Sequence, residues 1–262
     1  MEKIILVTGG SRGIGAATCL KAAREGYKVA VNYRADRAAA DDVVARITAL
    51  GGTAIAVGGD VGVESDIEAM FETVDRKLGT LTALVNSAGI SVSCRVAAFD
   101  GADLSRLMAV NVVGTMLCCR EAVRRMSTAT GGRGGAIVNV SSMAATIGGR
   151  MNASAYASSK AAVDSFTAGL AKEVGAEGIR VNALRPGVTI TDMTAAVRDD
   201  PQVRAEIAET IAMNRPAEVD EIAAPIMFLL SDGASFVSGA CVNAGGGGFL
   251  IKGSPGGRAP QE

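Results

Sequence analysis

The sequence contains no histidine at any of its 262 positions. This absence excludes a catalytic triad built on histidine and removes the commonest zinc ligand. Acid–base chemistry must therefore use tyrosine, lysine, cysteine or carboxylate side chains. The five cysteines are scattered and odd in number, and none has the spacing of a metal ligand. We therefore predict no metal site and expect mostly reduced, buried thiols, as in a cytoplasmic protein.

Net charge and long apolar runs are also scarce. The formal net charge is −1, and such a balance argues against a surface that binds nucleic acid or an anionic membrane. No apolar run reaches the length of a membrane span, and no signal-peptide pattern precedes the first motif. We therefore expect neither nucleic acid nor a membrane as a partner.

The sequence does contain a strict alternation of short apolar runs and longer helical patterns, which predicts an α/β fold with a parallel sheet covered on both faces. The predicted strands are 4–7, 27–33, 53–57, 81–85, 136–140, 179–184 and 240–242. The predicted helices are one that ends near residue 25, then 36–50, 65–78, 101–126, 154–175 and 218–230. No linker divides this pattern, so we predict one domain over residues 1–251 and a flexible tail over 252–262.

A glycine-rich segment directly follows the first predicted strand and opens the first helix. Its sequence is Thr8-Gly9-Gly10-Ser11-Arg12-Gly13-Ile14-Gly15. Glycines there permit a tight turn and let a pyrophosphate approach the helix N-terminus, where free N–H groups and the helix dipole favour anions. Glycines also serve ordinary turns, but the strand–turn–helix context favours a dinucleotide site. The spacing Gly-x-x-x-Gly-x-Gly differs from the commoner Gly-x-Gly-x-x-Gly.

The end of the second predicted strand distinguishes between the two nicotinamide cofactors. An NAD enzyme usually places an acid there for the ribose 2′-hydroxyl, whereas an arginine accommodates a 2′-phosphate. This chain has Asn32, Tyr33 and Arg34, with no acid before Asp36, and a second arginine, Arg12, in the glycine-rich segment. Both arginines could simply face solvent, but the pattern favours NADP(H) over NAD(H).

Further candidates follow the later strands, at the edge where ligands of open α/β sheets bind. Asp60 could accept a hydrogen bond from an adenine amino group or cap a helix. Asn111 is a polar residue in an apolar helical stretch and needs a partner or a purpose. Ser142 ends the fifth strand, with Ser141 beside it. The remaining candidates for the cofactor site are Val61, Asn86, Ala88, Gly89, Pro186, Gly187, Thr189 and Thr191.

Tyr156 and Lys160 lie four residues apart in a segment of helical composition, so they share one face of the predicted helix. A phenol has an ordinary pKa of about 10 and is a weak acid at neutral pH. An adjacent ammonium would stabilise the phenolate and lower that pKa, which would make Tyr156 a usable proton donor or acceptor. Such pairs also occur on many surface helices, so the interpretation depends on the cofactor site.

Together these motifs resemble those of the short-chain dehydrogenase/reductase family in its compact, single-domain form. They occur in family order between Lys3 and Gly247. The matching motifs are Thr8-Gly9-x-x-x-Gly13-x-Gly15, Asn86-x-Ala88-Gly89, Asn111, Ser142, Tyr156-x-x-x-Lys160 and Pro186-Gly187. The resemblance implies a doubly wound, seven-stranded parallel sheet of Rossmann type in three α/β/α layers. It also implies a homotetramer assembled through the helices over 101–126 and 154–175.

The resemblance also assigns roles to four residues. It implies that Tyr156 is the general acid–base and that Ser142 holds the substrate carbonyl or hydroxyl. Lys160 would bind the nicotinamide ribose as well as lower the Tyr156 pKa, and Asn111 would support a water in the proton relay. Three departures from the family pattern occur. Ser87 replaces the second Asn of Asn-Asn-Ala-Gly, the spacing from Ser142 to Tyr156 is one residue longer than in many members, and Asn243-Ala244-Gly245-Gly246 replaces Val-Asp-Gly-Gly.

We therefore predict an NADP-dependent oxidoreductase that transfers hydride between nicotinamide and a ketone or secondary alcohol. The resemblance is strongest to 3-oxoacyl-carrier-protein reductases and to sugar dehydrogenases such as glucose 1-dehydrogenase, and the sequence does not separate the two. The predicted lid over 190–213 is short and partly apolar, which favours a small or linear substrate. A nucleotide-binding regulatory protein without turnover is an alternative that does not need Ser142, Tyr156 and Lys160 together. A Rossmann methyltransferase explains neither the Tyr156–Lys160 pair nor Asn111.

Overall fold

A single seven-stranded sheet runs through the protein in the computed structural model, which describes residues 2–249. The strands are β1 (Lys3–Thr8), β2 (Tyr27–Tyr33), β3 (Ala54–Gly58), β4 (Ala83–Asn86), β5 (Gly135–Val140), β6 (Ile179–Pro186) and β7 (Cys241–Ala244). All neighbouring strands are parallel, and their order is β3-β2-β1-β4-β5-β6-β7. The predicted doubly wound, seven-stranded parallel sheet is confirmed. The tail predicted to be flexible, 252–262, lies outside the described residues.

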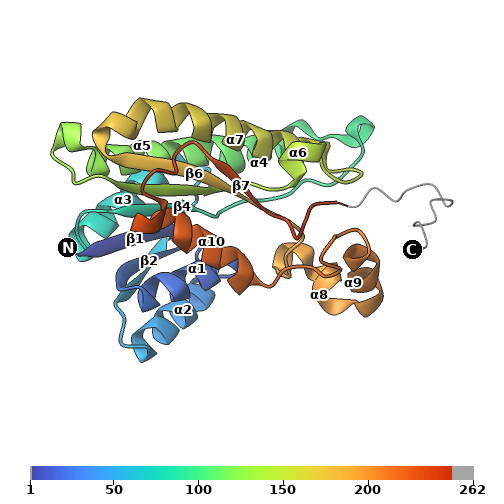
Figure 1. Ribbon diagram of the computed structural model, residues 1–262, viewed down its shortest axis with the longest axis horizontal. Coiled ribbons are helices and arrows are strands. Elements are labelled where there is room, and N and C mark those ends of the chain that lie inside the picture. Colours follow the sequence, from blue (N-terminus) through green and yellow to red (C-terminus); the bar gives the residue numbers. More distant parts are fainter. Residues whose placement is uncertain (1, 250–262) are drawn as a thin grey trace, which may run out of the picture.

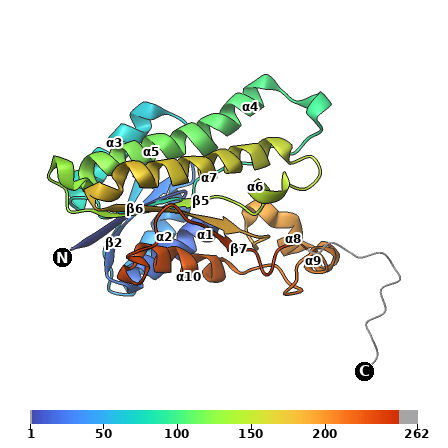
Figure 2. The same ribbon diagram turned by 45° about the horizontal axis from the view of Figure 1, so that its top comes forward.

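Helices cover both faces of this sheet and give the predicted three layers (Figure 1). One face carries α1 (Gly13–Arg24), α2 (Arg37–Ala49) and α10 (Val219–Leu230). The other carries α3 (Glu64–Lys77), α5 (Gly114–Met126) and α7 (Ser154–Val174). In the turned view, α4 (Gly101–Met108) continues the line of α5 on that second face (Figure 2).

The apolar runs of the strands explain this two-sided covering. In β1, Ile4 and Leu6 belong to the core cluster beneath α3, α5 and α7, whereas Ile5 and Val7 belong to the cluster beneath α1, α2 and α10. Successive side chains of a strand point to opposite faces, so a continuous apolar run contributes side chains to both core clusters. All four side chains are buried, which holds the carboxyl end of β1 rigidly in the middle of the sheet.

The helix predicted over 101–126 is interrupted. A π-helical turn, Ala109–Val113, joins α4 to α5, and Asn111 lies in it. Turns of this kind are rare and often occur at functional sites. By length and composition alone, 101–126 is apolar enough to cross a membrane. Its Cys118, Cys119 and Ala122 pack into the core beneath the sheet, which accounts for its apolar character.

Strand order reverses between β1 and β4, because β1 to β3 progress in one direction and β4 to β7 in the other. Open α/β sheets bind ligands at such a point, outside the carboxyl ends of the strands. Three short helices that the sequence patterns did not predict also lie near this end of the sheet (Figure 1). They are α6 (Ala144–Ile147), α8 (Ala195–Asp199) and α9 (Pro201–Ala208).

Candidate active site

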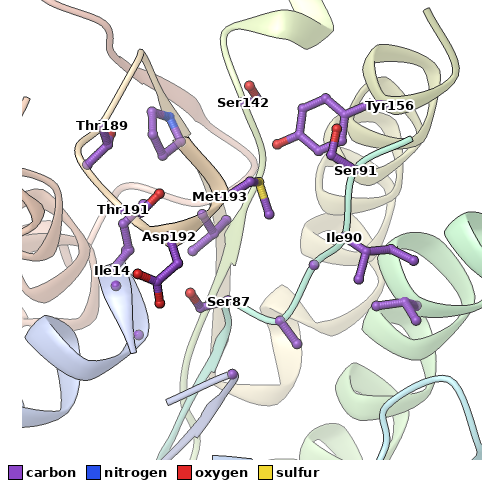
Figure 3. A pocket seen from close by; sticks show the side chains of 18 of the residues that line it. Ile14, Ser87, Ile90, Ser91, Ser142, Tyr156, Thr189, Thr191, Asp192 and Met193 are labelled. Carbon is purple, nitrogen blue, oxygen red and sulfur yellow. The ribbon is translucent and has the colours of Figure 1, made fainter. Parts of the chain in front are cut away.

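A cavity of about 1020 Å³ opens at the carboxyl ends of the central strands. Its lining comes from the glycine-rich loop, the ends of β2 to β6, the start of α7 and the segment after β6. Figure 3 shows Ser142, Ser91 and Tyr156 on one side of this space and Ile14, Ser87 and Asp192 on another. All of the predicted site residues line the cavity except Asn86 and Asn111. The structure therefore brings all but two of the predicted residues to one cavity.

The glycine-rich loop has the close backbone contacts that its sequence predicts. Gly9 and Gly13 have φ values of +62° and +54°, a region that side chains with a Cβ rarely adopt. A Cβ on Gly15 would lie 2.2 Å from the Gly9 carbonyl oxygen. Arg12 is the N-cap residue of α1 and makes no side-chain cap, so the first N–H groups of the helix stay available to an anion.

Asn32 fixes the glycine-rich loop to the second strand. Its Oδ1 accepts a hydrogen bond from the backbone N–H of Gly9 at 3.0 Å. Its Nδ2 donates to the carbonyl oxygens of Val57 and Gly59 at 3.2 and 3.0 Å. The side chain is buried. Asn32 therefore sets the position of the loop by bridging three neighbouring segments at the carboxyl edge of the sheet.

The arginine and the acid that follow β2 have different surroundings. Arg34 and Asp36 both line the cavity, but the Asp36 carboxylate caps α2 by accepting a hydrogen bond from the N–H of Ala39 at 2.9 Å. The first acid after β2 is therefore occupied as a helix cap. Arg12 Nη1 lies 3.9 Å from Asp192 Oδ2, and both side chains are more than half exposed. Such an exposed pair is weak, which leaves Arg12 able to exchange partners.

Asp60 has a partner that the sequence did not predict. Its Oδ2 accepts a hydrogen bond from Arg106 Nη2 at 2.5 Å, and its Oδ1 accepts one from the N–H of Gly62 at 2.8 Å. Burial by itself would raise the Asp60 pKa, but these two interactions hold that pKa below its usual range. The residue that caps α3 is Val63, so the helix-cap alternative for Asp60 is wrong.

Tyr156 and Lys160 share one face of α7, as their spacing predicts, and both line the cavity. The hydroxyl of Tyr156 is directed toward the strand end that carries Ser142 (Figure 3). Lys160 is 5% exposed, and its Nζ donates a hydrogen bond to the Val140 carbonyl oxygen at 2.9 Å. The same Nζ lies 5.9 Å from the centre of the Tyr156 ring.

The pKa values of this pair differ from the simple expectation. Burial lowers the Lys160 pKa to about 8, and the carboxylate of Asp164, one turn along α7, partly opposes that effect. Burial raises the Tyr156 pKa, against a smaller lowering by its hydrogen bond with Ser142. The expectation that Lys160 lowers the phenol pKa is therefore not met in this state. The physical reason is that desolvation of the phenolate outweighs an ammonium already engaged by Val140.

Asn111 and Asn86 lie behind the cavity wall. Asn111 is fully buried and holds the segment after β4 through both of its side-chain groups. Its Oδ1 accepts from the N–H of Ile90 and its Nδ2 donates to the carbonyl oxygen of Ile90, both at 2.9 Å. The Nδ2 of Asn111 also donates to Ser159 Oγ at 3.0 Å. Asn86 Nδ2 donates to Asn139 Oδ1 at 2.9 Å.

Several lining residues escaped sequence reasoning because they belong to no motif. They include Ser91, Arg106, Met143, Arg150, Met193 and Phe249. Met193 lies in the predicted lid, so its position followed the lid prediction in general terms. Arg106 and Asp60 are separated by 46 residues, and nothing in the sequence links them. Arg150 precedes α7 in a loop whose path the sequence pattern leaves open.

Comparison with known proteins gives a consistent picture. Residues 9–248 match the family model described as enoyl-(acyl carrier protein) reductase. The chain is 46% identical to an uncharacterized oxidoreductase of Escherichia coli over 245 residues, which cover 93% of this chain and 99% of the relative. It is 37% identical to a 3-oxoacyl-[acyl-carrier-protein] reductase of Synechocystis, over 94% of this chain and 96% of that protein.

Solved structures support the same conclusion. A short-chain dehydrogenase of Burkholderia cenocepacia, determined in complex with NADP, is 34% identical with a TM-score of 0.86 and covers 94% of this chain and 97% of its own. The promiscuous reductase LugOII, which catalyses a keto-reduction in lugdunomycin biosynthesis, is 35% identical with a TM-score of 0.87, over 95% and 98% of the two chains. The matched length, the sheet order and the shared site motifs together show that this chain belongs to the short-chain dehydrogenase/reductase family of oxidoreductases.

Proposed function

We propose that this protein is an NADP(H)-dependent oxidoreductase that interconverts a ketone and a secondary alcohol, with Tyr156 as its proton donor and acceptor. The observation that carries the proposal is the convergence of Ser142, Tyr156 and Lys160 on the same cavity as the glycine-rich loop. A protein that only bound a nucleotide would have no need for this acid–base group. The dimensions of the cavity leave room for a dinucleotide and a small substrate together.

The residues present fit the cofactor. The open N-terminus of α1 and the close approach of Gly9 and Gly15 suit a pyrophosphate, which a Cβ at Gly15 would exclude. Arg12 and Arg34 would hold a 2′-phosphate, and Asp60 would stand near the adenine. The other residues expected to contact NADP(H) are those of the predicted cofactor set that line the cavity. The relatives solved with NADP support this choice over NAD(H).

The pKa shifts support a role in carbonyl reduction. Because burial raises the Tyr156 pKa, the phenol keeps its proton at neutral pH and can donate it to a carbonyl oxygen. Ser142 would hold that oxygen by donating a hydrogen bond. Lys160 would stabilise the phenolate that remains and would bind the nicotinamide ribose. When bound, NADPH supplies the hydride that the carbonyl carbon accepts.

Asn111 would contribute from behind the wall, by supporting a water that returns a proton toward Lys160 and Tyr156. A Cβ placed on Gly89 would lie 3.4 Å from both Asn111 Oδ1 and Lys160 Nζ, so the two side chains meet at the same small residue. We also propose that the protein acts in the cytoplasm as a homotetramer. The relatives named as 3-oxoacyl-carrier-protein reductases make a 3-oxoacyl thioester one candidate substrate, beside a sugar.

Replacement of Tyr156 by Phe tests this function. The variant should lose at least about a hundredfold in NADPH oxidation with any accepted ketone, since it lacks the proton donor, while its affinity for NADPH stays nearly unchanged. Ketones, 3-oxoacyl thioesters and sugars would be screened by NADPH absorbance, and cofactor binding followed by fluorescence.

Tyr27→Phe is the matched control. Tyr27 is a buried tyrosine at the opposite end of β2 from the cavity, and its variant should keep wild-type turnover. Full activity in Tyr156→Phe would refute the assigned role. A wild-type protein that binds NADPH but turns over none of the three substrate classes would instead support the regulatory alternative.

A further inference from the structure

Apart from Lys160, which lies beside Tyr156, the wall of the cavity next to Ser142 and Tyr156 carries one charged side chain among the described residues. This wall, here called the substrate wall, is formed by Ile90, Ser91, Ser142, Met143, Ala144, Ile147, Arg150, Ala153, Met193 and Phe249. Arg150 is the charged member. Three acids also line the cavity, namely Asp36, Asp60 and Asp192. A substrate held next to the phenol of Tyr156 would therefore meet a mostly apolar surface on which Arg150 is the charged side chain other than Lys160.

Each of those three acids already has a partner elsewhere. Asp36 caps α2, and Asp60 pairs with Arg106. Asp192 contacts Arg12 and Arg198. The carboxylates of the cavity are thus engaged away from the substrate wall, and none of them neutralises the guanidinium of Arg150.

The contacts of Arg150 leave most of its donors unused. One nitrogen, Nη2, donates a hydrogen bond to Thr210 Oγ1 at 2.9 Å, and the guanidinium stacks 5.3 Å from the centre of the Phe249 ring. Within residues 2–249, Arg150 forms no ion pair with an acidic side chain. Arg150 is an exposed residue, and desolvation of its guanidinium by the atoms around it lowers its pKa from the usual value. A guanidinium has five N–H donors in a planar fork that matches a carboxylate.

We propose that Arg150 binds a carboxylate of the substrate, so that the preferred ketones of this enzyme are oxo acids. The inference rests on the function proposed above and adds the substrate class. A carboxylate would complete the hydrogen bonding of the guanidinium in a bidentate pair. The stacking on Phe249 and the bond to Thr210 orient the fork and restrict its motion, which reduces the entropy lost on binding.

The rest of the substrate wall limits the body of such a substrate. Met143, Ile147 and Met193 add apolar side chains to the lining of the cavity, so an aliphatic or aromatic spacer would lie between the ketone and the carboxylate. A polyhydroxylated sugar would leave its hydroxyls against this surface without partners. The substrate wall therefore favours an oxo acid over a sugar.

Matched pairs of substrates test the proposal. Short-chain and aromatic oxo acids would each be compared with their own methyl esters, by kcat/KM with saturating NADPH. Wild type should prefer the acid by about tenfold or more, the size expected for a hydrogen-bonded charge pair. Arg150→Met keeps the length of the side chain without its charge. It should bring the acid-to-ester ratio close to one, mainly through a higher KM for the acid.

A second variant separates charge recognition from a structural tether. Thr210→Val removes the hydrogen bond between Arg150 and the end of the lid but keeps the guanidinium, so it should retain the preference for the acid. If Thr210→Val and Arg150→Met lose the preference equally, or if Arg150→Met slows acid and ester alike, Arg150 is a structural clamp and the proposal is wrong.

Two further outcomes are distinguishable. Wild type that reduces esters and acids equally well overturns this proposal and leaves the proposed function intact. If neither series is turned over, the proposed function fails, and carboxylate recognition is measured separately. For that measurement, a non-reducible carboxylic acid and its amide would be titrated into the NADPH complex and followed by cofactor fluorescence. Equal binding of acid and amide overturns the proposal, and tighter binding of the acid supports it.

Discussion

Lys160 should destabilise the folded protein that it serves, and Lys160→Met measures by how much. The side chain is 5% exposed, and burial lowers its pKa from 10.5 to about 8. That difference corresponds to about 3 kcal/mol of unfavourable free energy for keeping the ammonium charged inside the protein at neutral pH. Methionine has a similar length and no charge, so the substitution removes this cost.

One hydrogen bond is lost in the exchange. Lys160 Nζ donates to the Val140 carbonyl oxygen at 2.9 Å, and a buried carbonyl left without a donor costs about 1–2 kcal/mol. The net expectation for Lys160→Met at pH 7 is a gain of about 1–2 kcal/mol in the free energy of unfolding. For a chain of this size, such a gain raises Tm by about 4 °C. The same variant should have lost nearly all turnover, because Tyr156 no longer has its cationic neighbour.

The gain should depend on pH in a defined direction. Folded Lys160 releases its proton above about pH 8, whereas the unfolded chain keeps it up to 10.5. Between these values the unfolded state binds more protons, so the stability of wild type rises with pH relative to the variant. The advantage of Lys160→Met is therefore complete below about pH 8 and falls above it by about 1.4 kcal/mol per pH unit. It is lost at about pH 9.5, and at higher pH the missing hydrogen bond to Val140 makes the variant less stable than wild type.

Urea unfolding followed by circular dichroism, at pH 7 and at pH 9.5 and at one fixed protein concentration, measures this difference. NADPH oxidation in the same preparations gives the activity. A variant that is less stable than wild type at pH 7, or a stability difference that does not change between the two pH values, would refute the assignment of a buried, costly ammonium.

Two further sets of substitutions test the cofactor site and its support. Arg12→Gln should weaken NADPH binding by about tenfold and leave NADH binding almost unchanged. Asp192→Asn removes a competitor for Arg12 and should strengthen NADPH binding a few-fold. Equal effects on the two cofactors in fluorescence titrations would contradict a 2′-phosphate site. Asn111→Ala leaves the N–H and the carbonyl of Ile90 without their side-chain partners. It should lower the free energy of unfolding by about 2–4 kcal/mol. A urea-unfolding loss below about 1 kcal/mol would show that Asn111 does not hold that segment.

The sequence predicted those features that depend on short-range pattern. Strands such as β1 could be recognised because a strand that is buried on both faces consists almost entirely of apolar residues. The Tyr156–Lys160 spacing places both side chains on one helical face whatever surrounds them. The glycine-rich loop was predictable because a run of glycines between a strand and a helix is typical of a tight turn at a helix N-terminus. The NADP preference followed from a local feature, the position of Asp36 beyond Arg34, and the structure adds that Asp36 caps α2.

What the sequence could not predict depends on contacts between distant segments. The Asp60–Arg106 pair joins residues 46 positions apart. The helix-cap interpretation of Asp60 was wrong because α3 begins after Val63, three residues further along the chain. The π-helical turn at Ala109–Val113 interrupts a continuous apolar run just before Gly114, and the helical pattern of the sequence runs through it. Burial, which a sequence does not display, also reversed the expected direction of the Tyr156 pKa.

The lack of histidine and the burial of Tyr156 and Lys160 have a common consequence. An imidazole changes its charge near neutral pH without help, but this chain must obtain a similar range from groups whose ordinary pKa values are near 10. Burial lowers the Lys160 pKa to about 8 and raises that of Tyr156, so below about pH 8 both groups hold their protons, the phenol as a neutral donor and the lysine as a cation. In the protonated phenol and the still largely charged ammonium, the protein holds a proton donor beside the charge that would stabilise its conjugate base. That combination favours reduction of a carbonyl. It is lost as the pH rises through about 8, because Lys160 then loses its charge.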